Sequence, residues 1–198
     1  MPDHSRFDEA FFTRYYGDPE TRVADDGDAE RLAGLIAGAV DYTGLRVRRI
    51  LDAGCGVGLL RAPLAARFPR ASYTGLEYSE FLCRKYGWER GSLGDYAARA
   101  PFDLVVCHDV LQYLDDRTAA RSLANLRPLC RGMLYFSVLT RRDWRVAADQ
   151  SRTDRDVHLR DGDWYRRRLR RGFRHLGFGV HLVRDIRPVQ WELEAPWA

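Results

Sequence analysis

Apolar residues alternate along the chain between short continuous runs and stripes at helical spacing. The runs predict five strands, over residues 49–53, 72–77, 88–92, 102–108 and 133–139. Helical spacing between the runs predicts helices over residues 59–68, 79–86 and 118–129. The run at 102–108 is apolar throughout its middle, as a strand buried on both faces should be. This alternation favours a doubly wound α/β sheet with right-handed crossovers.

The two ends of the chain have different patterns. Apolar positions at helical spacing over 7–16 and 29–40 predict an N-terminal helical cap within residues 1–41. Beyond a core at 42–139, we expect an irregular stretch over 140–163 and then another helix. Its apolar stripe comprises Tyr165, Leu169, Phe173 and Leu176. Apolar runs over residues 180–186 and 189–193 predict a terminal hairpin. We therefore expect a single domain with a mostly parallel seven-stranded sheet and an antiparallel strand at its C-terminal end.

Composition narrows the class of protein. The chain has 198 residues, of which 45% are hydrophobic and 30% charged, so it is long enough to bury a core without disulfides or metals. No stretch approaches the ~20 consecutive apolar residues of a membrane helix, and the polar start, Met1 to Arg6, lacks the apolar centre of a signal peptide. We therefore expect a cytoplasmic protein with no membrane partner.

Neither the charges nor the cysteines predict a nucleic-acid or metal site. The net charge is +4, but 28 acidic residues interleave with the arginines, which favours a solvated surface of mixed sign over a nucleic-acid face. The basic run Arg166 to Arg168, extended by further arginines up to Arg174, leaves RNA binding open as an alternative. Four cysteines, Cys55, Cys83, Cys107 and Cys130, lack metal-ligand spacing, so we expect free thiols and no metal.

A glycine-rich turn follows the first predicted strand, in the sequence ILDAGCGVG over residues 50–58. Gly54, Gly56 and Gly58 let the backbone turn sharply and approach a ligand closely, and free amides at the following helix start favour an anionic group such as a carboxylate. The segment resembles motif I of class I methyltransferases that use S-adenosylmethionine. The resemblance implies a Rossmann-like fold and that cofactor, with Asp52 near its amino-acid part and Cys55, within the turn, among the residues that bind it.

A dinucleotide-binding dehydrogenase is the rival interpretation of this turn. Its fingerprint requires a glycine where this chain has Leu59. Glu77 ends the second predicted strand 23 residues after Gly54, where its carboxylate can accept hydrogen bonds from both ribose hydroxyls, with Tyr78 next to it. Turn and glutamate together favour the methyltransferase.

Further segments resemble the same family. In Leu-Gly-Asp-Tyr at 93–96, the resemblance implies that Asp95 contacts the adenine amino group and that Tyr96 packs on the ring. Residues 102–114, FDLVVCHDVLQYL, resemble the family's fourth strand and the helical segment after it. The resemblance covers roughly residues 41–139, and the product would be S-adenosylhomocysteine.

Methyl transfer is an in-line displacement that needs the acceptor held at about 3 to 3.5 Å from the methyl group, and a base only if the acceptor arrives protonated. We expect His108 and Asp109 at the end of the fourth strand, or His158 in the 140–163 stretch, to supply that base. Histidines at these places are equally consistent with a lining residue of the cofactor pocket and a surface residue. Tyr15 and Tyr16 could close over the cofactor, with Tyr16 in contact with it. Contacts with the acceptor are expected from aromatic and histidine side chains: Tyr15, Tyr113, Trp144, His158 and Trp164.

The acceptor itself stays open at this point. The segment Cys107 to Val110 differs from the Asn/Asp-Pro-Pro-Tyr signature of many amino-methylating nucleic-acid enzymes. We therefore predict methylation of an O, N or S atom of a small molecule. The alternatives are a tRNA or protein methyltransferase, and a protein that binds S-adenosylmethionine for other chemistry or as a sensor. The sequence does not determine the oligomeric state.

Overall fold

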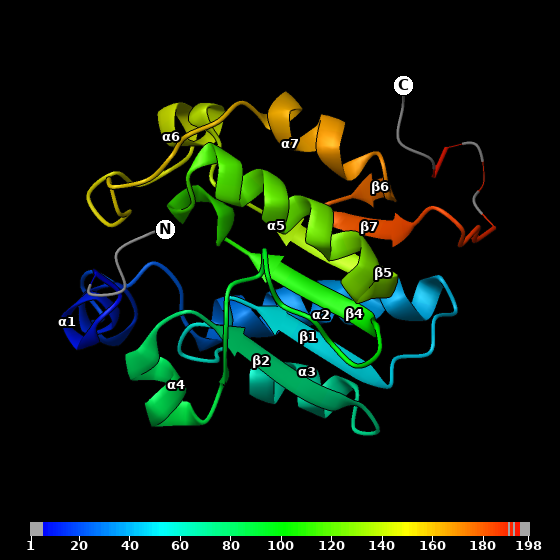
Figure 1. Cartoon of the computed structure of the whole chain (residues 1–198), viewed down its shortest axis with the longest axis horizontal. Helices are drawn as coiled ribbons and strands as arrows, with labels where there is room; N and C mark the ends of the chain where they lie inside the picture. Colours follow the sequence, from blue (N-terminus) through cyan, green and yellow to red (C-terminus); the bar gives the residue numbers. More distant parts are fainter. Residues whose placement is uncertain (1–5, 190, 192, 195–198) are drawn as a thin grey trace.

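A single seven-stranded sheet forms the centre of the computed structural model, which describes residues 6–189, 191, 193 and 194 (Figure 1). Its strands are β1 (Arg49–Ala53), β2 (Ser72–Glu77), β3 (Glu89–Arg90), β4 (Phe102–His108), β5 (Cys130–Ser137), β6 (Phe173–Gly177) and β7 (Val180–Val183). They lie in the order β3-β2-β1-β4-β5-β7-β6, and β7 is antiparallel to both of its neighbours while the other pairs are parallel. This arrangement confirms the predicted fold class.

The strand order reverses between β1 and β4, which are hydrogen-bonded neighbours. In open α/β sheets, a crevice forms outside the carboxyl ends of the strands at such a reversal. Residues that follow β1, β2 and β4 are therefore brought to the same edge. The sheet thereby gathers the glycine turn, Glu77 and His108 from separate parts of the chain.

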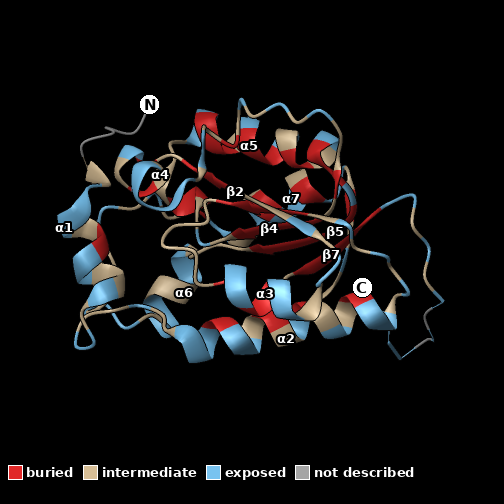
Figure 2. Ribbon diagram, turned by 90° about the horizontal axis from the view of Figure 1, so that it is seen from below, coloured by how far each residue is buried: buried red, intermediate tan, exposed pale blue. Residues whose placement is uncertain are grey.

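Helices cover both faces of the sheet, and the described part of the chain contains none that is long and apolar enough to cross a membrane. They are α1 (Glu9–Phe12), which continues as a π-helical turn (Thr13–Gly17), α2 (Asp26–Tyr42), α3 (Arg61–Arg67), α4 (Glu80–Tyr86), α5 (Asp116–Leu129), α6 (Arg141–Val146) and α7 (Gly162–Leu169), with a 3₁₀ turn η3 (Leu111–Tyr113). Strand β4 shows the two faces: Leu104 and Val106 pack toward α2 and α3, whereas Val105 and Cys107 pack toward α5 and α7. Buried residues accordingly follow the strands and the inner sides of α2 and α5 (Figure 2).

The C-terminal prediction was wrong in two places. The predicted helical stripe ends at Leu169, because Gly172 and the turn around it stop α7, and Phe173 begins β6 instead. The hairpin joins β6 to β7 through Phe178 and Gly179, both at positive φ, as a two-residue turn between twisted strands requires. The second predicted hairpin strand is not formed: residues 189, 191 and 193 lie outside strands, and residues 190 and 192 are outside the described part.

The stretch 140–163 is less irregular than predicted. It contains α6, whose start is fixed by a capping box in which Thr140 and Asp143 bond each other's backbone amides. Beyond α6, the buried Arg160 holds the segment against η3. Its guanidinium donates to the carbonyl oxygens of Leu111, Leu114 and His158 and to the hydroxyl of Tyr165.

We expect Arg160→Met to lower the free energy of unfolding by about 3 kcal/mol, because three carbonyl oxygens, one of them in a buried bond and two in partly buried bonds, would lose this donor. Denaturant titration measures this change. Arg171→Met provides the matched control, since Arg171 is an exposed arginine of the same region. Equal stability of the two variants would show that the Arg160 contacts do not hold the segment.

Candidate functional site

The glycine turn is fixed between two neighbouring segments, those that carry Val110 and Trp88. Gly54 and Gly58 both have positive φ, at 80° and 84°. A Cβ at Gly54 would lie 2.4 Å from Val110, and one at Gly58 would lie 2.6 Å from the Trp88 ring, so neither position has room for a side chain. The Trp88 indole also donates to the carbonyl oxygen of Gly56 at 2.9 Å. Trp88 thus shapes the turn, a role that sequence analysis did not assign.

Glu77 lies against this turn at the carboxyl end of β2. Its side chain is buried and accepts hydrogen bonds from the backbone amides of Gly56 at 2.9 Å, Tyr78 at 2.7 Å and Ser79 at 2.8 Å. Burial raises the pKa of Glu77, and the amide bonds oppose that rise. A carboxylate offers about four acceptor positions, so acceptor capacity remains for a ligand.

Asp52 is the second buried carboxylate of the turn. It accepts a hydrogen bond of 2.6 Å from the hydroxyl of Tyr73 on the neighbouring strand. Burial raises the pKa of Asp52 to about 6, although the Tyr73 hydrogen bond acts in the opposite direction. A nearby cation would stabilise the charged form of this carboxylate.

Two adjoining cavities open at this edge of the sheet. The larger has a volume of about 510 Å³ and reaches from Asp52 and the turn toward α2 and the 150s loop. The smaller, of about 110 Å³, lies between Glu77, Leu93 and Val110. Six residues border both cavities: Tyr16, Gly54, Gly56, His108, Asp109 and Tyr113. The two cavities therefore adjoin at these residues, one smaller and one larger, at the same edge of the sheet.

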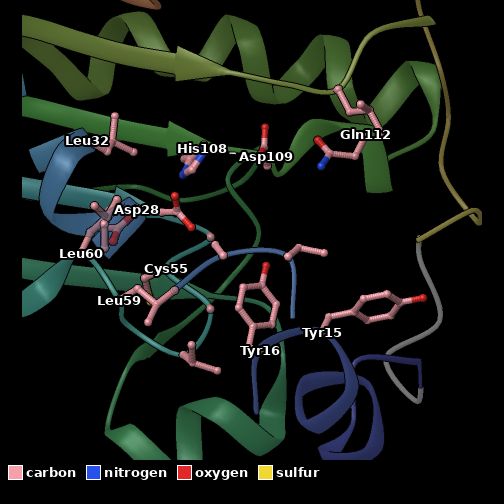
Figure 3. Close-up of a pocket in the computed structure, with 18 of the residues that line it drawn as sticks. Tyr15, Tyr16, Asp28, Leu32, Cys55, Leu59, Leu60, His108, Asp109 and Gln112 are labelled. Atoms are coloured by element: carbon pink, nitrogen blue, oxygen red, sulfur yellow. Dashed lines mark ion pairs between the residues drawn. The ribbon is translucent and has the colours of Figure 1, made fainter. Parts of the chain in front are cut away.

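His108 and Asp109 project from the end of β4 into the region where the cavities meet (Figure 3). The imidazole Nε2 lies 3.3 Å from a carboxylate oxygen of Asp109, whose other oxygen accepts a 2.9 Å bond from the Ser137 hydroxyl. Burial opposes the charged imidazole, but the hydrogen bond and charge of Asp109 outweigh it and raise the pKa of His108. For Asp109, the bonds from His108 and Ser137 likewise outweigh burial and lower the pKa. The φ of Asp109 is +53°, an uncommon value for this residue type that is often found at functional sites.

Replacing Asp109 with asparagine should lower the pKa of His108, because burial would then act without the opposing carboxylate. Asparagine also tolerates positive φ, so the backbone can be kept. An NMR titration of the His108 ring protons measures the shift. Asp95→Asn is the control, as Asp95 is exposed and pairs with Arg121 outside the cavities. A His108 titration midpoint that stays in place or rises would contradict the assigned coupling.

The N-terminal cap closes one side of the site. Ser79 donates to the carbonyl oxygen of Phe7 at 2.6 Å, and the Phe7 ring packs edge-on against Tyr113. Tyr16 borders both cavities, and its pKa is raised by burial and by the charges of Asp109 and Glu77. Tyr15 lines the larger cavity only. The structure therefore brings both predicted lid tyrosines to the site.

Several other predicted residues are not brought there. Asp95 and Tyr96 lie outside both cavities, because a turn that starts at Ser92 leads the chain away and Tyr96 bonds Glu89. The His158 side chain is exposed, and only its backbone amide reaches the site region, donating to the carbonyl oxygen of Gln112. Trp144 also lies outside the two cavities, and Trp164 lines a separate groove between α5 and α7.

Other residues take their places. Ser92 and Leu93 line the smaller cavity where Asp95 and Tyr96 were expected. Thr153 and Asp154 represent the 150s loop in the larger cavity in place of His158. Ser92 is the last residue of the third predicted strand, and that position at a strand end is a signal that could have identified it. Asp154 is brought in by an ion pair with Arg6, 148 residues away, which no local pattern indicates.

Comparison with known proteins agrees with the fold and the turn. A family model described as a methyltransferase domain matches residues 51–132. A trans-aconitate 2-methyltransferase of Deinococcus radiodurans is 36% identical over 90 residues, covering 40% of this chain and 34% of that protein. A ubiquinone biosynthesis O-methyltransferase of Xylella fastidiosa is 32% identical over 151 residues, 67% of this chain and 57% of that protein. The chain thus spans about a third of the length of the first relative and somewhat more than half of the second.

A solved structure shows the same architecture over nearly the whole chain. The magnesium protoporphyrin IX methyltransferase of Synechocystis, with bound S-adenosylhomocysteine, superposes with a TM-score of 0.63 at 20% identity and covers 91% of this chain and 95% of its own. At that identity the likeness concerns the fold. The sheet order is that of Rossmann-like methyltransferases, and with the glycine turn and the domain match over residues 51–132 the chain is similar to the class I, S-adenosylmethionine-dependent methyltransferases.

Proposed function

We propose that this chain transfers a methyl group from S-adenosylmethionine to an O, N or S atom of a small molecule. The observation that carries the proposal is the pair of adjoining cavities at the carboxyl edge of the sheet. The smaller is bordered by Glu77, the larger has a volume of about 510 Å³, and His108 and Asp109 border both. Methyl transfer requires two molecules held next to each other, and two adjoining cavities can hold a cofactor beside an acceptor.

The residues present fit this cofactor. With three backbone amides bound, Glu77 keeps about one of its four acceptor positions for a ribose hydroxyl. The apolar walls of the smaller cavity, Leu93 and Val110, suit the faces of an adenine ring. Asp52 would lie near the amino-acid part and offer a carboxylate to its ammonium group. When bound, S-adenosylmethionine supplies a methyl group on a positively charged sulfur, a leaving group that needs no further activation.

The chain itself contributes position and proton transfer. Tyr16 and Tyr113 border the region where the two cavities meet and limit the water that reaches it. His108 can take a proton from an acceptor, and Asp109 stabilises the imidazolium that results. Ser137 keeps Asp109 oriented through its 2.9 Å hydrogen bond.

Calorimetry with S-adenosylmethionine and S-adenosylhomocysteine tests the cofactor. We expect one site for each and no binding of NAD, since Leu59 stands where a dehydrogenase needs glycine. Incubation with methyl-labelled cofactor and either a metabolite extract or bulk tRNA then tests the acceptor. Label in small molecules supports the proposal, whereas label in tRNA alone, or no cofactor binding, would overturn it.

A further inference from the structure

The larger cavity has an unusual set of polar groups. Four carboxylates and four phenols border it: Asp28, Asp52, Asp109, Asp154, Tyr15, Tyr16, Tyr113 and Tyr135. No arginine or lysine is among the described residues that line this cavity, and His108 is the one basic side chain there. The larger cavity therefore offers carboxylates and aromatic rings, which are the groups that attract cations.

Not all of these carboxylates are available. Asp28 is held by Arg31 and by the capping box of α2, and Asp154 is paired with Arg6. Asp52 lies beside the glycine turn, where the proposed cofactor's own ammonium group would be. Asp109 is bonded to Ser137 and His108 but to no arginine of the described chain, so it is the carboxylate best placed to attract the charge of a second molecule where the cavities meet.

Gln112 adds an independent observation. It is 5% exposed, lines the larger cavity, and its side-chain oxygen has no hydrogen-bond partner within the described part of the chain. Its amide end points from η3 toward the space in front of Asp109 and His108 (Figure 3). Buried polar groups in folded proteins nearly always have a partner, so this oxygen is left with capacity to accept a hydrogen bond from a molecule in the cavity.

We propose that the methyl acceptor is a small amine and that Gln112 is the residue that selects it. This inference rests on the proposed methyl-transfer function. The Gln112 oxygen would accept one N–H of the amine, and Asp109 would attract its charge. The amine proton passes to the imidazole of His108. The nitrogen lone pair then forms the N–CH₃ bond as the C–S bond breaks and leaves its electron pair on sulfur.

The same groups disfavour polyanionic acceptors. Trans-aconitate, the acceptor named for one relative, carries three carboxylates. In this cavity they would face Asp52 and Asp109 with no arginine or lysine among the described lining residues to pair with. A buried carboxylate without a cationic partner loses its hydration, and a second carboxylate beside it repels it. Both effects disfavour a polyanionic acceptor.

A matched pair of probes tests the charge preference without turnover. We would titrate 2-phenylethylamine and 3-phenylpropionate, similar in shape and opposite in charge, into the protein saturated with S-adenosylhomocysteine. The amine should bind at least tenfold more tightly. Equal affinities, or tighter binding of the carboxylate, would overturn the inference. Cofactor affinity is measured separately, so failure here differs from failure of the proposed function.

Two variants test Gln112 itself. Gln112→Leu keeps the size of the side chain but removes the acceptor, so affinity for the amine should fall at least tenfold while S-adenosylhomocysteine affinity stays within twofold. Gln112→Glu keeps an acceptor and should retain or improve amine binding. Gln150→Leu, at an exposed position of the 150s loop, is the control and should match the native protein. Unchanged amine affinity in Gln112→Leu would remove Gln112 from acceptor recognition.

Discussion

Replacing His108 with asparagine is expected to lower turnover roughly 10²- to 10⁴-fold, the usual contribution of a positioned general base. Affinity for S-adenosylhomocysteine should change little. The pKa of His108 is raised, and a base works only when unprotonated, so native turnover should increase with pH up to that pKa and then level off. In the variant this rise should disappear. Initial rates measured across pH, with the acceptor identified from the labelled extract, would show both effects.

His158→Asn is the matched control for this experiment. His158 is exposed and lies outside both cavities, although the sequence made it an equal candidate for the base. Its substitution should leave turnover within about twofold of the native rate. If His158→Asn lost activity instead and His108→Asn did not, the base would have been assigned to the wrong loop.

Glu77→Gln is expected to weaken binding of S-adenosylhomocysteine at least tenfold. Charge-assisted hydrogen bonds contribute about 1.5 to 3 kcal/mol each, and a tenfold change in affinity corresponds to about 1.4 kcal/mol. Glutamine is preferred to alanine because Glu77 also accepts from the amides of Gly56, Tyr78 and Ser79, which alanine would leave without an acceptor.

Glu80→Gln serves as the control, since Glu80 begins α4 three residues later and pairs on the surface with Arg84 and Arg90. Its affinity for the cofactor product should equal that of the native protein. Thermal unfolding of both variants, followed without ligand, separates loss of binding from loss of structure. If the folded Glu77→Gln protein bound S-adenosylhomocysteine with native affinity, Glu77 would not be the residue that contacts its ribose.

The parts of the site that the sequence predicted are those set by local spacing. The glycine turn, Glu77 and His108 each lie at the end of an apolar run, and parallel strands bring such ends together. Ser92 was missed because β3 is only two residues long, so its end was placed too late in the chain. Phe173 was assigned to a helix because its spacing from Leu169 fits the helical period as well as a new strand does.

Contacts between distant segments could not be predicted in the same way. Asp154 enters the site through Arg6, and Arg160 reaches the carbonyl oxygens of η3, more than 40 residues earlier. The unpaired oxygen of Gln112 is visible only once burial is known, since the sequence around it is equally consistent with a solvated turn. Each of these depends on tertiary packing rather than on residue order.

Tyr16 borders both the smaller and the larger cavity. A molecule that orders this ring from one side lowers the entropic cost of binding on the other side. By thermodynamic linkage, the acceptor must then tighten cofactor binding by the same factor by which the cofactor tightens acceptor binding. Because the two cavities share this one ring, we expect positive cooperativity between the cofactor and the acceptor that the proposed function requires.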